Sequence, residues 1–156
     1  MSALEVKLLL EERGWMLATA ESCTGGMIAA ALTDVPGSSA VFDRGFITYS
    51  NPAKIETLGV KIETLAAHGA VSEPVVAEMA EGSRARSRAY MSIAVSGIAG
   101  PGPAENTPEG RVCFGLSFGS DVATETVDFG ARGRDAVRRA TVEHALALIL
   151  LHAGDD

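Results

Sequence analysis

The sequence of 156 residues contains few aromatic side chains and few cysteines. Aromatic residues make up 5% of the chain, and the two cysteines, Cys23 and Cys113, match no metal-binding spacing. A chain of this length can bury a core without a disulfide, and its three histidines lie far apart in the sequence. The sequence therefore favours a reduced, cytoplasmic protein without a bound metal.

Basic residues and long apolar runs are also scarce. There are 13 basic against 20 acidic residues, a net charge of −7, which argues against nucleic-acid or membrane-surface binding because both need a basic surface. No stretch reaches the roughly 18 apolar residues of a membrane span, and the N-terminus lacks the order of a signal peptide. Apolar residues account for 47% of the chain, which indicates a globular protein with a single domain over residues 1–156.

Apolar runs separated by turns predict alternating helices and strands. Strands are expected over residues 15–20, 41–49, 90–95, 112–118 and 124–129. Helices are expected over residues 2–13, 25–33, from 52 onward, 72–88 and 134–152. This order predicts an α/β protein, a three-layer α/β/α sandwich with a mixed β-sheet.

The most informative segment is Thr-Ala-Glu-Ser-Cys-Thr-Gly-Gly over residues 19–26, where a strand turns into a helix. Such a turn points N–H groups at a ligand, so the backbone from Thr24 through Gly25 to Gly26 is a candidate site for a phosphate or an oxyanion. Ser22 is either a nucleophile or a helix cap. Cys23 is a competing nucleophile, although a small buried cysteine is the favoured interpretation.

A serine nucleophile needs a base, and histidine is a poor candidate in this chain. None of the histidines has a recognisable aspartate partner: His68 is expected in a loop and His144 to pack within the last helix. Lys54 follows a strand and a Ser-Asn-Pro turn, and Tyr49 lies across the same turn, so both side chains can face one pocket. A partly desolvated lysine can accept a proton near neutral pH. The alternative is a surface lysine beside a half-buried tyrosine.

Two further segments supply candidate substrate-binding residues. Ser96, Gly97 and Gly100 belong to a glycine-proline loop that follows an apolar strand, and ligands of α/β sheets gather at the carboxyl ends of strands. Arg134 and Arg138 lie one turn apart at the start of the last helix. They form either a phosphate clamp or an exposed basic face.

Taken together, these motifs resemble the CinA C-terminal domain family. Their order and spacing agree with the family over nearly the full chain. The matching stretches are TAESCTGG (19–26), PGSSA (36–40), GFITYSNPAK (45–54), HGAVSEPVVAEM (68–79), SGIAGPG (96–102) and GRDAVR (133–138). Two departures are Gly102-Pro103-Ala104, where the family continues with glycines, and Gly133, where the family commonly has aspartate.

The resemblance implies an amidohydrolase that converts nicotinamide mononucleotide to nicotinate mononucleotide and ammonia in pyridine-nucleotide recycling. It further implies that Ser22 attacks the amide carbon, that Lys54 is the general base, that Tyr49 assists, and that no cofactor is needed. The partner is then a small nucleotide substrate. The alternative is a non-catalytic, competence-associated accessory domain that binds nucleotides, because larger members fuse this domain to another.

The last helix also bears on oligomeric state. Its end is rich in apolar residues: Leu146, Leu148, Ile149, Leu150 and Leu151. An apolar helix of this kind is compatible with burial against a partner, so a homo-oligomer is one possibility.

Overall fold

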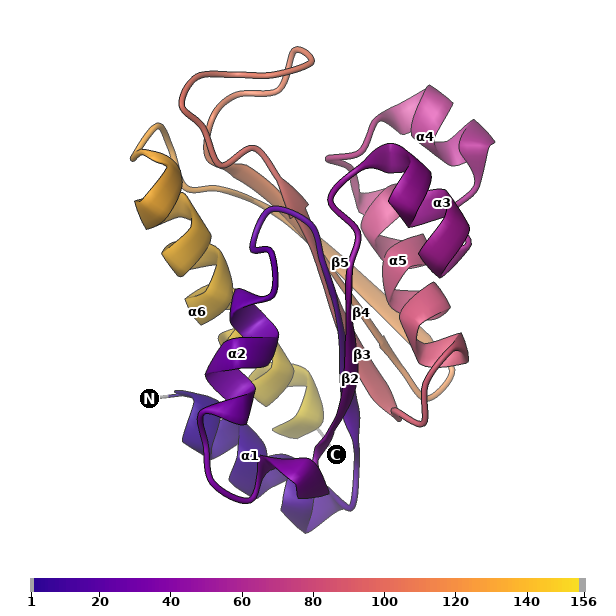
Figure 1. Cartoon of the computed structure of the whole chain (residues 1–156), viewed down its shortest axis with the longest axis vertical. Coiled ribbons are helices and arrows are strands. Elements are labelled where there is room, and N and C mark those ends of the chain that lie inside the picture. Colours follow the sequence, from indigo (N-terminus) through magenta and orange to yellow (C-terminus); the bar gives the residue numbers. More distant parts are fainter. Residues whose placement is uncertain (1, 155–156) are drawn as a thin grey trace.

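In the computed structural model, which describes residues 2–154, helices cover both faces of a five-stranded sheet (Figure 1). The strands are β1 (Leu17–Glu21), β2 (Phe42–Ile47), β3 (Met91–Gly97), β4 (Arg111–Phe118) and β5 (Asp121–Asp128). The helices are α1 (Ser2–Arg13), α2 (Met27–Thr33), α3 (Asn51–Leu58), α4 (Ile62–His68), α5 (Glu73–Ala85) and α6 (Arg134–Gly154), with a short 3₁₀ turn at Ser38–Ala40.

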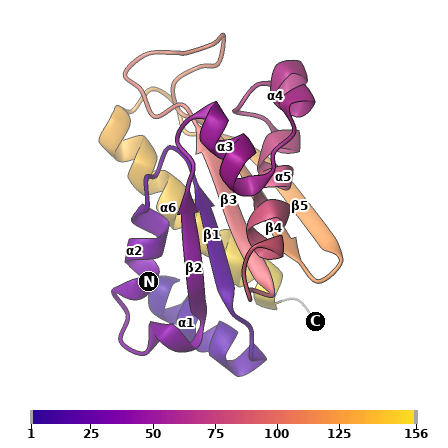
Figure 2. The same ribbon diagram turned by 45° about the vertical axis from the view of Figure 1, so that its right-hand side comes forward.

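The sheet is mixed, with the order β2-β1-β3-β4-β5, which Figure 2 shows from one edge to the other. β1 pairs in parallel with both β2 and β3, whereas β3, β4 and β5 pair antiparallel. All five residues of β1 are buried, as expected for a central strand covered on both faces. The predicted three-layer α/β/α sandwich with a mixed sheet is confirmed.

Each face of the sheet has its own apolar core. α1, α2 and α6 cover one face, and α3, α4 and α5 lie on the other (Figure 1). Small residues allow the second layer to approach closely: a Cβ at Gly82 of α5 would lie 1.9 Å from the carbonyl oxygen of Leu58. A Cβ at Gly115 of β4 would lie 2.5 Å from the carbonyl oxygen of Val76. Glycine at these two positions therefore allows α5 to approach the end of α3 and the strand β4 closely.

Two expectations about individual elements were wrong. The α4 helix was not predicted, and His68, expected in a loop, is its last residue, followed by Gly69 with φ +80°. No residue of α4 is fully buried, and the helix is only seven residues long, so its apolar positions Ile62, Leu65 and Ala66 give a weak periodic signal. β5 begins at Asp121, three residues before the expected start.

The apolar end of α6 packs within the chain itself. Leu146, Leu148 and Ile149 are buried in the core that α6 shares with α1 and the sheet, whereas Leu151 is 57% exposed. His144 packs against the rings of Phe114 and Phe129, as predicted. The apolar character of this helix is thus explained without a second protomer. Among residues 2–154 no helix is long and apolar enough to cross a membrane.

Candidate active site

The candidate site lies at the carboxyl edge of the parallel strands, where ligands of α/β sheets bind. Ser22 directly follows β1, Tyr49 follows β2 by two residues, and Ser96 lies near the end of β3. Two hydrogen bonds hold these strand ends together. The Ser22 N–H donates to the carbonyl of Val95 (3.1 Å), and the Thr48 N–H donates to the carbonyl of Glu21 (2.8 Å).

Local sequence places Lys54 in the first turn of α3. Ser50 caps this helix, its hydroxyl accepting a hydrogen bond from the Ala53 N–H at 3.2 Å. Pro52 lies at the helix start, where its fixed φ is compatible with the first turn and its missing N–H costs nothing. The Ser-Asn-Pro turn therefore fixes where the helix begins and so where the lysine side chain points.

The Lys54 ammonium group reaches the hydroxyl of Ser22. Its Nζ lies 3.0 Å from Ser22 Oγ, 2.9 Å from the carbonyl oxygen of Thr48 and 3.4 Å from that of Tyr49. Lys54 is only 1% exposed, so its side chain is not a solvated surface lysine. The expected serine–lysine contact is present in the structure.

Burial sets the protonation behaviour of this pair. Removal from water lowers the pKa of Lys54 because the charged ammonium loses hydration, while the negative charge of Glu105 raises it. Burial raises the pKa of the neighbouring Cys23 to about 11. At neutral pH Cys23 is therefore a neutral thiol, in agreement with its interpretation as a small buried residue, and a neutral lysine amine is more accessible than in water.

The helix end behind Ser22 is already occupied by a carboxylate. Glu21 Oε1 accepts hydrogen bonds from Thr24 Oγ1 (2.6 Å), the Gly26 N–H (3.2 Å) and the Ile28 N–H (2.9 Å), and Oε2 accepts from the Ala29 N–H (3.0 Å). Glu21 is 1% exposed. An acidic group at the positive end of α2 is favourable for the helix dipole. The anion that binds to this turn is therefore the carboxylate of Glu21, and not an external ligand.

This arrangement corrects the expected oxyanion donors. The Gly26 N–H is bound to Glu21, and the Gly25 N–H donates to the carbonyl of Ser22 at 3.1 Å. In the described part of the chain, no other residue accepts a hydrogen bond from the N–H of Cys23 or of Thr24, and the Cys23 N–H lies against its own thiol. Of the predicted donors only the Thr24 N–H remains free for a ligand.

The two arginines of α6 that were predicted to bind substrate have different surroundings. Arg138 holds the nucleophile turn, with Nε 3.0 Å from the carbonyl oxygen of Cys23 and Nη2 3.2 Å from that of Thr24. It is half-buried and points at the turn, which differs from the expected phosphate clamp. Arg134 is exposed at the entrance of the site and donates to the carbonyl of Gly100 and to the hydroxyl of Tyr49, both at 2.7 Å.

These side chains surround a cavity of about 210 Å³. Six of the predicted residues line it: Ser22, Tyr49, Lys54, Ser96, Gly97 and Arg134. Five predicted residues lie outside its lining: Thr24, Gly25, Gly26, Gly100 and Arg138. Among residues 2–154 no cluster of histidine, cysteine or acidic side chains could hold a metal ion.

Sequence reasoning missed two acidic residues. Glu21 directly precedes the nucleophile turn, and an acidic residue before a Gly-Gly helix start is a signal for an internal cap that could have been recognised. Glu105 also lines the cavity, from the glycine-proline loop. The position of Glu105 depends on the turn between Ala104 and Thr107, which the sequence does not predict.

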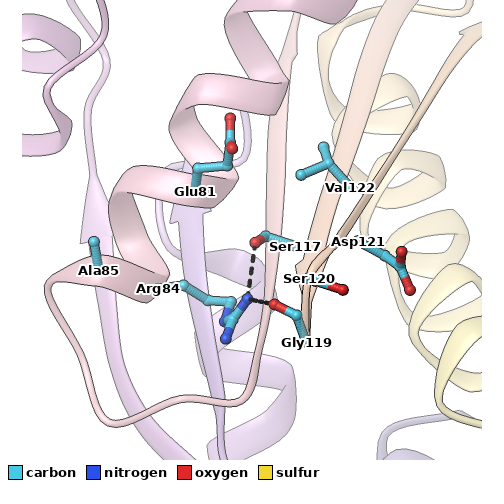
Figure 3. Close-up of a pocket in the computed structure, with 8 residues that line it drawn as sticks. All are labelled: Glu81, Arg84, Ala85, Ser117, Gly119, Ser120, Asp121 and Val122. Carbon is cyan, nitrogen blue, oxygen red and sulfur yellow. Dashed lines mark hydrogen bonds between the residues drawn. The ribbon is translucent and has the colours of Figure 1, made fainter.

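A larger hollow, of about 380 Å³, lies between α5 and the β4–β5 turn, at the opposite edge of the sheet. There Arg84 Nη1 donates to Ser117 Oγ (3.3 Å) and to the carbonyl of Gly119 (2.6 Å) (Figure 3). The carboxylates of Glu81 and Asp121 point away from this guanidinium. These hydrogen bonds join α5 to the β4–β5 turn. The size of the hollow alone does not make it a catalytic site.

Fold and site together define an α/β domain in which a serine after the central strand meets a buried lysine at the carboxyl edge of the sheet. Residues 2–152 match the CinA C-terminal domain, and the chain belongs to this family. The resemblance seen in the sequence motifs is thereby confirmed.

Relatives of two lengths match the chain. The nicotinamide-nucleotide amidohydrolase PncC of Escherichia coli K12 is 49% identical over 143 residues, which are 91% of this chain and 87% of that protein. A putative competence-damage inducible protein of Symbiobacterium thermophilum is 50% identical over 150 residues, but the match spans only 35% of its length. The crystal structure of the competence/damage inducible protein CihA of Agrobacterium tumefaciens superposes with a TM-score of 0.93 at 44% identity, covering 98% of this chain and 93% of that one.

Proposed function

We propose that this protein is an amidohydrolase that converts nicotinamide mononucleotide to nicotinate mononucleotide and ammonia. The observation that carries the proposal is the 3.0 Å contact between Lys54 Nζ and Ser22 Oγ inside the cavity. The relative named as a nicotinamide-nucleotide amidohydrolase supports the choice of substrate, since it matches most of both chains.

In the first half of the reaction, Ser22 Oγ attacks the amide carbon and its proton passes to the neutral amine of Lys54. The carbonyl oxygen becomes an oxyanion, which we assign to the N–H groups of Cys23 and Thr24. Lys54 then returns the proton to the leaving nitrogen, and ammonia departs from an ester with Ser22. The positive charge of the pyridinium ring withdraws electrons from the amide carbon and so assists the attack.

In the second half, a water molecule takes the place of ammonia. Lys54 removes a proton from this water, the water oxygen attacks the ester, and Ser22 Oγ leaves with the proton. The hydroxyl of Tyr49 pairs with the guanidinium of Arg134 and not with Ser22 or Lys54, so we assign both groups to the polar end of the nucleotide in place of the assisting catalytic role that the resemblance implies for Tyr49. Arg134 supplies the positive charge that its phosphate needs.

Release of ammonia from nicotinamide mononucleotide by the purified protein tests this function. Ser22→Ala and Lys54→Ala are each expected to lower kcat by about 1,000-fold or more, since nucleophile and base act as one unit. The matched control is Ser87→Ala, which removes a hydroxyl that precedes β3, whereas the site lies at the other end of that strand. Binding without hydrolysis by the wild-type protein would instead support the nucleotide-binding accessory domain.

A further inference from the structure

One acidic side chain occupies an otherwise neutral or basic cavity. Among the described residues that line it, the charged side chains are those of Lys54, Arg134 and Glu105, and Glu105 alone is acidic. A substrate ring with a positive charge would be repelled by Arg134, and by Lys54 whenever that side chain is protonated. Glu105 supplies the opposite charge in the same space.

The backbone around Glu105 is a tight two-residue turn. Ala104 and Thr107 exchange two hydrogen bonds, from the Ala104 N–H (3.0 Å) and from the Thr107 N–H (2.8 Å). Glu105 and Asn106, between them, have φ values of 50° and 62°. Such turns favour glycine, asparagine or aspartate, and glutamate is an unfavourable choice for the first position. A glutamate whose backbone is kept in the left-handed region at the lining of the cavity indicates a role for its side chain.

The stem of this loop is tied to the start of α6. Glu109 accepts hydrogen bonds from the Gly102 N–H (2.7 Å) and the Gly133 N–H (2.9 Å), and Arg134 donates to the carbonyl of Gly100 (2.7 Å). The loop rises at the carboxyl edge of the sheet, between α6 and the α3–α4 side (Figures 1 and 2). These contacts hold the turn of Glu105 at the cavity.

We propose that Glu105 is a specificity residue that selects amides carried by a cationic ring, by placing a carboxylate where the pyridinium charge of the substrate lies. The proposal rests on the proposed function for the identity of the amide. It goes beyond that function in naming the side chain that reads the ring charge. Because Glu105 lines the cavity and is not one of the bond-breaking groups, its substitution is expected to affect binding more than turnover.

Two ligands separate charge from shape. Nicotinamide mononucleotide has a cationic ring, and its dihydropyridine form has a neutral ring with the same carboxamide, ribose and phosphate. Glu105→Gln is expected to raise the KM of the cationic form roughly 5- to 20-fold, between the effect of an exposed ion pair and that of a charge-assisted hydrogen bond. The inhibition constant of the neutral form stays within about twofold of wild type, because no net charge interacts with it.

Two control variants test whether the effect depends on the carboxylate of Glu105. Glu105→Asp retains the carboxylate and is expected to restore most of the affinity, while Glu12→Gln changes an exposed carboxylate on α1 and is expected to leave both ligands unaffected. An equal loss for the cationic and the neutral ligand would overturn the proposal, because a displaced loop affects both. No change for either ligand would overturn it as well.

The pH profile gives an independent readout. Two titratable groups act on Lys54: Glu105, whose negative charge raises the pKa of Lys54, and Cys23, which is uncharged at neutral pH. Glu105→Gln therefore lowers that pKa and moves the acidic limb of kcat/KM to lower pH. An unmoved limb contradicts the placement of Glu105 beside the base.

Calorimetric titration of the two ligands into Ser22→Ala protein separates failure of this inference from failure of the proposed function, because no turnover is needed. If the wild type fails to hydrolyse the nucleotide while the Ser22→Ala protein prefers the cationic ligand and loses that preference with Glu105→Gln, the function is wrong and the specificity stands. If hydrolysis is found and Glu105→Gln changes neither affinity, the specificity is wrong and the function stands.

Discussion

Replacement of Glu21 by alanine is expected to lower the free energy of unfolding by about 4 kcal/mol. The substitution leaves four donors without their carboxylate: the Thr24 hydroxyl and the N–H groups of Gly26, Ile28 and Ala29. An unsatisfied buried donor costs about 1–3 kcal/mol, and the sum is reduced where water enters the space left behind. A loss of about 4 kcal/mol is a large part of the total stability of an ordinary domain, about 5–15 kcal/mol.

Glutamine at the same position is expected to cost less, about 1–2 kcal/mol. Its amide oxygen can keep the three hydrogen bonds that Oε1 of Glu21 accepts. Its NH₂ group then replaces Oε2 and faces the Ala29 N–H, so that two donors oppose each other. The order of stability is therefore wild type, Glu21→Gln, Glu21→Ala.

Urea unfolding followed by circular dichroism measures both losses, with Glu12→Ala on the exposed face of α1 as the control that should change stability by less than about 0.5 kcal/mol. A loss below about 1 kcal/mol for Glu21→Ala would refute the reasoning, since it is the size of one ordinary hydrogen bond. The reasoning would also be refuted if the Glu21→Gln protein were no more stable than the Glu21→Ala protein.

Three further outcomes follow from the same contacts. Because Lys54 must be neutral to accept a proton, kcat/KM should rise with pH and level off below the pH at which an ordinary lysine titrates, burial having lowered its pKa; a limb at the usual lysine pKa would contradict this. Cys23→Ala should retain most of the activity in ammonia-release assays, because this buried cysteine is a neutral thiol at neutral pH; a loss as large as that of Ser22→Ala would make the thiol the nucleophile. Gly82→Ala should destabilise the protein by about 3 kcal/mol in urea unfolding, since its Cβ would overlap the Leu58 carbonyl, whereas Gly154→Ala, with open space, should be nearly neutral.

The sequence predicted the parts of the site that depend on chain order. Ser22 and Tyr49 follow strands and Ser96 lies near the end of one, and parallel strands bring such ends together at one edge. The helix signals of Ser50 and Pro52 likewise fixed the start of α3 and with it the position of Lys54. Local signals of this kind are readable without a structure.

The parts that could not be predicted depend on which partner fills a position. The turn after β1 was expected to bind an external anion, but the side chain of Glu21 already lies there. Arg138 was expected at a phosphate and instead bonds to two carbonyl groups of the turn. A sequence shows that donors are available, whereas the choice between an internal and an external acceptor depends on packing.

The identity of the nucleophile is the central claim, and a quenched reaction tests it most directly. Wild-type protein is mixed with nicotinamide mononucleotide, quenched in acid during turnover, digested and mapped by mass spectrometry. An acyl group derived from the nucleotide is expected on Ser22 of the peptide that contains residues 17–28, and Ser22→Ala protein should show neither this adduct nor turnover. An acyl group on Cys23, or hydrolysis by Ser22→Ala protein at the wild-type rate, would contradict the account.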